Sequence, residues 1–76
     1  MKRPKILPAA RAEISEAARF YEQRVPGLGR SLVSEARSAI SWVAENPIAS
    51  PVLLDEIRGR VLRQFPYTIF YRADTR

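Results

Sequence analysis

The sequence predicts one α+β domain, in which a short N-terminal strand leads into an antiparallel helical hairpin that packs on a small antiparallel β-sheet. Two segments, 8–24 and 29–45, carry apolar residues at helical spacing and are separated by only a few residues. The segment 57–72 is rich in aromatic and β-branched residues, which favour strands. A chain of 76 residues has room for one such domain and not for two.

The first segment, 3–7, is expected to be a short strand, because an apolar pair follows a basic start. Pro4 cannot donate to a sheet ladder, so this strand should lie at an edge of the sheet or begin only at Lys5. Pro8 suits the first turn of the helix that follows, where its missing N–H costs nothing.

Each predicted helix carries one apolar face. The residues on these faces are Ala10, Ile14, Ala17, Ala18 and Tyr21 in the first helix, and Leu32, Val33, Ala36, Ala39, Ile40 and Val43 in the second. The segment 26–29 (Pro-Gly-Leu-Gly) predicts a tight turn between them. Pro47 ends the second helix, because a residue before proline is pushed out of the α region. Two helices with so short a connection should be antiparallel.

The C-terminal third predicts a β-hairpin. Residues 47–56 contain two prolines and no period, so we expect a loop there, followed by strands over 57–65 and 67–72 with a turn at Pro66. The evenly spaced apolar residues of the first strand are Ile57, Val61 and Phe65, and those expected on its opposite, solvated face are Arg58 and Arg60. In the second strand, Tyr67 and Tyr71 should point to one side of the sheet, and we expect Phe65 and Phe70 to be core or packing residues.

Charge is distributed unevenly along the chain. The sequence holds 13 Lys and Arg against 8 Asp and Glu, a net charge of +5. From residue 57 onward the charged residues are Arg58, Arg60, Arg63, Arg72 and Arg76 against Asp74 alone. This basic third favours an acidic partner, either nucleic acid or a negatively charged protein segment, and the alternative is a solvated surface. The acidic residues Glu13, Glu16, Glu22 and Glu35 are expected on solvated helix faces.

The absence of Cys and His from the sequence excludes a disulfide scaffold and the usual zinc ligand sets, so we expect no metal and no cofactor. Nothing resembles a phosphate loop or a nucleophile elbow, and we expect no small-molecule substrate. A domain this small has a thin margin of stability, which favours a protein partner. With no secretory signal at the basic start and no apolar run of roughly 20 residues, we expect a cytoplasmic protein without membrane contact.

Several junctions, taken in order, carry a resemblance to a known family. They are Pro8-Ala9-Ala10, Arg19-Phe20-Tyr21-Glu22, Pro26-Gly27-Leu28-Gly29, Glu45-Asn46-Pro47 and, above all, Arg63-Gln64-Phe65-Pro66-Tyr67-Thr68-Ile69-Phe70-Tyr71-Arg72. This arrangement resembles the RelE/ParE toxins of type II toxin–antitoxin (plasmid stabilisation) systems, and it spans essentially the whole chain. The resemblance implies a toxin that a cognate antitoxin neutralises by wrapping it.

The two branches of that family differ in mechanism. RelE-like proteins cut mRNA on the ribosome, whereas ParE-like proteins inhibit DNA gyrase and are not known to hydrolyse anything. Thr68 stands where the RelE branch has a phosphate-holding arginine, and the other catalytic residues of that branch lie beyond the end of this sequence. We therefore expect a ParE-like gyrase inhibitor with no catalytic residues. The alternatives are a ribosome-dependent mRNA endoribonuclease and a truncated, non-toxic module that only binds antitoxin.

The sequence departs from the family pattern in two places. Leu7 stands where a capping Ser is common, so the first helix should lack its usual N-cap. The apolar strand and basic tail that follow the equivalent of Asp74 in the family are missing here, so strand 67–72 is expected to show unpaired backbone groups. A partner that supplies a strand would cover that edge.

The resemblance and the charge pattern together single out two groups of candidate contact residues. The residues expected to contact the target or the antitoxin are Arg58, Arg60, Arg63, Tyr67, Tyr71 and Arg72, and those of a possible antitoxin-facing apolar patch are Phe20, Tyr21 and Trp42. For the arginines the alternative is a solvated strand face, and for the aromatic residues it is packing between helices and sheet.

Overall fold

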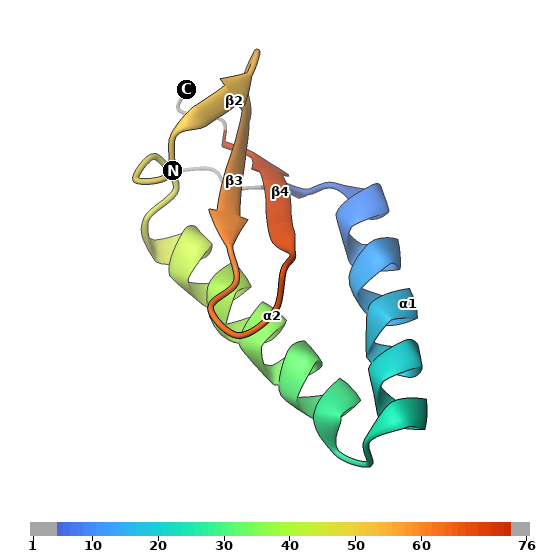
Figure 1. Ribbon diagram of the computed structural model, residues 1–76. Coiled ribbons are helices and arrows are strands. Elements are labelled where there is room, and N and C mark those ends of the chain that lie inside the picture. Colours follow the sequence, from blue (N-terminus) through green and yellow to red (C-terminus); the bar gives the residue numbers. More distant parts are fainter. Residues whose placement is uncertain (1–4, 74–76) are drawn as a thin grey trace.

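The computed structural model describes residues 5–73, and within them the chain forms two helices and a four-stranded sheet (Figure 1). In chain order the elements are β1 (Lys5–Ile6), α1 (Pro8–Arg24), α2 (Leu28–Glu45), β2 (Val52–Leu54), β3 (Ile57–Val61) and β4 (Thr68–Arg72). The coarse α+β architecture predicted from the sequence is confirmed. Arg3 and Pro4 of the expected first strand lie outside the described residues, as do Asp74 and Arg76 of the basic C-terminal third.

The helical hairpin forms where apolar spacing predicts it. Helix α1 begins at Pro8, and Leu7 in front of it makes no side-chain capping bond, as expected from the sequence. The helix ends after Arg24, where the Val25 N–H still donates to the Tyr21 carbonyl at 2.9 Å. The predicted apolar faces are the buried or half-buried faces of both helices.

Two glycines shape the turn between the helices. Gly27 has a φ of 91°, a left-handed conformation that glycine adopts without the Cβ clash other residues suffer. At Gly29 an added Cβ would lie 2.3 Å from the Ala18 carbonyl oxygen. The helices therefore approach most closely beside this turn, and Figure 1 shows them spreading apart toward their other ends.

The sheet has the strand order β1-β4-β3-β2, and all neighbouring strands are antiparallel. Strand β4 therefore lies between β1 and β3, so the expectation that it would show unpaired backbone groups is wrong for Phe70–Arg72. It holds for Thr68–Ile69, which no described residue of β1 reaches. The chain's own β1 covers part of it, with Lys5 opposite Arg72 and Ile6 opposite Tyr71. The Leu7 N–H continues this pairing by donating to the Phe70 carbonyl at 3.2 Å.

Two further corrections concern strand limits. The expected loop over 47–56 contains β2, which two prolines had hidden and which pairs with β3 across a turn. Strand β3 ends at Val61 and not at Phe65, because the chain bends there to bury Leu62 and Phe65. Inside this bend the Leu62 N–H donates to the Tyr67 carbonyl, and the Tyr67 N–H to the Phe65 carbonyl, both at 2.9 Å.

The core lies between the sheet and the two helices, which cover one face of the sheet only. In β4 the side chains of Ile69 and Tyr71 point into it and are 1% and 0% exposed. Phe65 is buried in the core. Phe70 is 37% exposed on the outer face, so of the two expected roles, core or packing, the core is excluded for it. Ile69 and Phe65 belong to the main hydrophobic cluster. Its other buried members are Ile14, Ala17, Leu32, Ala36, Ala39 and Leu62.

Within the described part of the chain, neither helix is both long and apolar enough to cross a membrane.

Candidate binding site

Arg58 and Arg60 lie on the helix-facing side of the sheet. Residues directly opposite each other on antiparallel strands point to the same face, and these two are opposite Tyr71 and Ile69, which are buried. The predicted alternation along β3 is correct, but the sequence assigned its two faces the wrong way round. The physical reason is that β4 fixes the orientation of β3, because the buried pair Ile69 and Tyr71 must face the helices.

The Arg58 side chain forms hydrogen bonds within the chain. Its Nη1 donates to the Ser50 carbonyl at 2.6 Å and to the Ile48 carbonyl at 3.2 Å. Both acceptors belong to the segment between α2 and β2, so the guanidinium holds this segment against the sheet. Arg58 is half-buried there, and its N–H groups on this side are occupied.

Arg60 lies against Trp42 of α2. Its guanidinium carbon is 3.9 Å from the centre of the Trp42 ring, a cation–π contact that joins the edge of the sheet to the helix. Both side chains are half-buried, so the pair forms part of the surface and not of the core. This contact explains why a tryptophan stands at position 42, next to the apolar face of α2 but not part of it.

Arg63 and Arg72 are exposed. Arg72 lies at the end of β4 opposite Lys5 and Ile57, and this register places it on the outer face. Arg63 lies in the bend after β3, where its N–H and that of Gln64 donate to the Glu35 carboxylate of α2. Glu35 thus fixes the bend to the helix instead of standing free on a solvated helix face.

The two candidate tyrosines differ. Tyr71 is fully buried and its hydroxyl donates to the Pro47 carbonyl at 3.2 Å, so it is not available at the surface. Tyr67 is half-buried and lies edge-to-face against Tyr21, with 6.4 Å between the ring centres. Burial, and then the hydrogen bond with Tyr21, raise the pKa of Tyr67 above its usual value.

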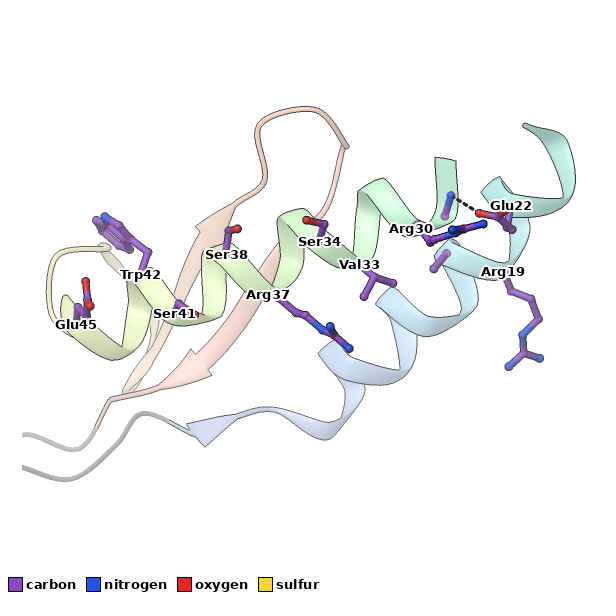
Figure 2. Close-up of a pocket in the computed structure, with 12 residues that line it drawn as sticks. Arg19, Glu22, Arg30, Val33, Ser34, Arg37, Ser38, Ser41, Trp42 and Glu45 are labelled. Carbon is purple, nitrogen blue, oxygen red and sulfur yellow. Dashed lines mark hydrogen bonds between the residues drawn. The ribbon is translucent and has the colours of Figure 1, made fainter. Parts of the chain in front are cut away.

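Phe20, Tyr21 and Trp42 do not form one patch. Tyr21 turns inward and packs edge-to-face on Phe65 at 5.3 Å between ring centres. Phe20 is 51% exposed near the end of α1, where the Arg24 guanidinium carbon lies 4.7 Å from its ring centre. Trp42 lies near the C-terminal end of α2. Figure 2 shows it at the opposite end of α2 from Glu22, which follows Tyr21 in α1.

Sequence reasoning missed an apolar surface on the outer face of the sheet. Its members are Leu53 (55% exposed), Leu54 (67%), Val61 (66%) and Phe70 (37%), and they are called here the outer apolar face. Gly59 lies at its centre, and a Cβ there would lie 2.8 Å from Leu53 Cδ1, so Leu53 lies directly across the glycine backbone. Had the apolar run 52–54 been interpreted as a strand, the sequence would have indicated this surface.

Beside the outer apolar face, part of β3 forms a free edge. Strand β2 provides partners only for Ile57 and Arg58, so among the described residues Gly59–Val61 has no strand neighbour on that side. A hollow borders this edge, and Ser50, Pro51, Leu53 and Val61 are among its lining residues. An exposed strand edge next to apolar side chains can accept an additional strand.

Glu22 closes the turn between the helices. Its Oε2 accepts the Gly27 N–H at 2.8 Å and its Oε1 accepts the Gly29 N–H at 3.0 Å. The Gly27 bond is the main cause that lowers the pKa of Glu22, and Arg30 contributes in the same direction. Glu22 therefore caps the start of α2, a structural role that the sequence alone had not indicated.

A wide hollow also runs along the solvent side of α2. Figure 2 shows Ser34, Ser38 and Ser41 along it, with Glu22 at one end and Trp42 and Glu45 at the other. Its charges are mixed, since arginines and glutamates both line it. No group of three or more acidic residues in the described part of the chain is arranged to hold a metal ion.

The chain matches no protein-family model, no curated protein and no solved structure.

Proposed function

We propose that this chain is the toxin component of a RelE/ParE-type toxin–antitoxin module, and that it acts by binding DNA gyrase and not by catalysis. The observation that carries the proposal is the outer apolar face beside the free β3 edge. The sequence resemblance supplies the family, and the order of the elements is compatible with it.

A binding role fits the chemistry of this surface. Apolar side chains gather there, and the strand register places Lys5 and Arg72 on the same face of the sheet. Thr68 also lies on this face, opposite Val61, and offers no charge to hold a phosphate. Nothing in this arrangement favours RNA cleavage, which needs a proton acceptor, a proton donor and cations around one phosphate.

The neutralising antitoxin would use the same surface. An extended segment could add to Gly59–Val61 as a further strand, with alternate side chains on the outer apolar face. The net charge of +5 favours an acidic segment in that role, both for steering and for specificity. A second copy of this chain is disfavoured by the same charge. The proposed partners are therefore gyrase as target and an acidic antitoxin segment as inhibitor.

The test is pulse labelling of DNA and protein synthesis in bacteria after this chain is induced without antitoxin. We expect DNA synthesis to fall first. An earlier fall in protein synthesis would instead favour a ribosomal target, and no change in either, with the protein soluble and folded, would leave only antitoxin binding.

A pair of variants connects the effect to the surface. Val61→Asp adds a charge to the outer apolar face, and we expect it to abolish the fall in DNA synthesis. Ala12→Asp makes the same charge change on the exposed side of α1 and is the matched control. Equal loss in both variants would contradict the assignment of the outer apolar face.

A further inference from the structure

A second, smaller site lies on the helical side of the molecule. A cavity of about 240 Å³ opens between α1 and α2, and four isoleucines, Ile6, Ile14, Ile40 and Ile69, form its apolar walls. They come from β1, both helices and β4, so the cavity reaches from the surface toward the sheet. None of them belongs to the outer apolar face.

The packing of the helical hairpin explains why space remains here. Gly29 lets the helices approach closely beside the turn, and they spread apart away from it (Figure 1). In the widening interval the cavity is lined by Ala10 from α1 and Ala36 from α2. The two alanine side chains are too small to fill the space between the helices, so the cavity remains there.

The charged residues at this cavity are both cationic. Arg11 of α1 and Arg37 of α2 line it, together with Ser15, and none of its lining residues is acidic. Figure 2 shows the Arg37 side chain leaving α2 on the side of α1. Guanidinium groups bind carboxylates through paired hydrogen bonds, so the two arginines suit one carboxylate at an apolar slot.

We propose that this cavity binds a single-tailed aliphatic carboxylate. The tail would lie against Ile6 and Ile40, the half-buried isoleucines of the walls, with Ile14 and Ile69 behind them. The carboxylate would lie at the opening, between Arg11 and Arg37. The volume is below the roughly 300–1,000 Å³ of pockets for drug-sized ligands, so the ligand has about ten heavy atoms. This site is independent of the proposed toxin function, and either proposal can fail alone.

The experiment is an NMR titration of the full chain with sodium octanoate, followed through the isoleucine and valine methyl groups. We expect saturable shifts at Ile14, Ile40 and Ile69, with a Kd on the order of 1 mM or tighter. The Val61 methyl groups report adventitious binding to the outer apolar face. Larger shifts there than at the isoleucines would overturn the proposal.

Charge recognition is tested with variants and with a neutral ligand. R11Q and R37Q should each weaken octanoate binding roughly tenfold, as expected for the loss of a charged hydrogen-bond partner. R30Q is the matched control, since Arg30 is also an α2 arginine but does not line the cavity. 1-Octanol should bind at least about tenfold more weakly than octanoate. Equal binding of the two ligands, or equal effects of R37Q and R30Q, would refute the carboxylate assignment.

A further variant fills the cavity. A10L adds three carbon atoms at its wall, and we expect the saturable isoleucine shifts to disappear. Retained binding in a folded A10L chain would contradict the proposed location. If A10L does not fold, the arginine variants and the octanol comparison decide the question without it.

Discussion

The two faces of the sheet carry similar amino acids but have opposite surroundings. On the helix-facing side Ile69 and Tyr71 are 1% and 0% exposed, and Arg58 and Arg60 are half-buried among them. On the other side Val61 and Phe70 are 66% and 37% exposed, although both are large and apolar. Two arginines are thus half-buried on the covered face, whereas two large apolar side chains are exposed on the uncovered face.

The difference arises because the two helices cover only one face of the sheet. A strand with apolar side chains on both sides must leave one side bare when only two helices are available to cover the sheet. Each helix-side arginine has a partner in the chain, Arg58 two carbonyl oxygens and Arg60 the Trp42 ring. Large exposed apolar surface is typical of interaction sites, so the bare face is where a partner is expected.

The largest effect should separate the two faces directly. Tyr71→Ala removes a fully buried ring and its bond to the Pro47 carbonyl, and should lower the free energy of unfolding by about 3–5 kcal/mol. Phe70→Ala, one residue away on the outer face, should cost only about 1–2 kcal/mol, because that side chain is 37% exposed already. Urea denaturation of both variants measures the difference. Similar losses would mean that the outer face is covered after all.

The next largest effect tests how tightly the helical side is built. In Gly29→Ala the new Cβ would meet the Ala18 carbonyl, and overpacking of this kind should cost about 1–3 kcal/mol of unfolding free energy. Gly27→Ala is the control, because a Cβ there has no neighbour within 4 Å and only the positive φ is strained, at about 1 kcal/mol. If thermal denaturation ranks Gly27→Ala as the more damaging, the close approach of the helices is not the constraint we describe.

A smaller effect concerns the arginine that lies on the helix side. Arg60→Ala removes the cation–π contact with Trp42, and should cost about 0.5–1 kcal/mol and change the tryptophan fluorescence. Arg63→Ala, at an exposed side chain, should stay within about 0.5 kcal/mol and leave the fluorescence unchanged. Identical spectra for the two variants would argue against the stacked geometry.

The smallest expected effect is a dependence on pH at the helical turn. The pKa of Glu22 is lowered in the folded chain, so its contribution to stability is complete above the ordinary carboxyl pKa of 4.5. That contribution disappears as the pH falls through the lowered folded-state pKa. Glu22→Gln should flatten the loss of stability below that pH, measured by denaturation at several pH values. Glu16→Gln, at an exposed site on α1, should not, and an unchanged slope in Glu22→Gln would count against the capping role.

The candidate residues show how far sequence reasoning reached for the site. Of the arginines that it selected in the basic C-terminal third, Arg63 and Arg72 are exposed. It could not foresee that Arg58 and Arg60 have partners within the chain, because those partners come from the loop after α2 and from Trp42. It also overlooked the outer apolar face, because Leu53 and Leu54 stood in a segment interpreted as a loop.

The sequence by itself determined both helices, their apolar faces and the turn between them, because helical periodicity, glycine and proline act over neighbouring residues. It also determined the alternation in β3 and β4. The β3–β4 hairpin was also predicted from the sequence. Only the tertiary structure decided that β1 pairs with the other side of β4, that the arginines of β3 face the helices, and that Phe70 faces outward. Those outcomes depend on contacts between residues far apart in the chain, and a two-residue period carries no information about which side will be covered.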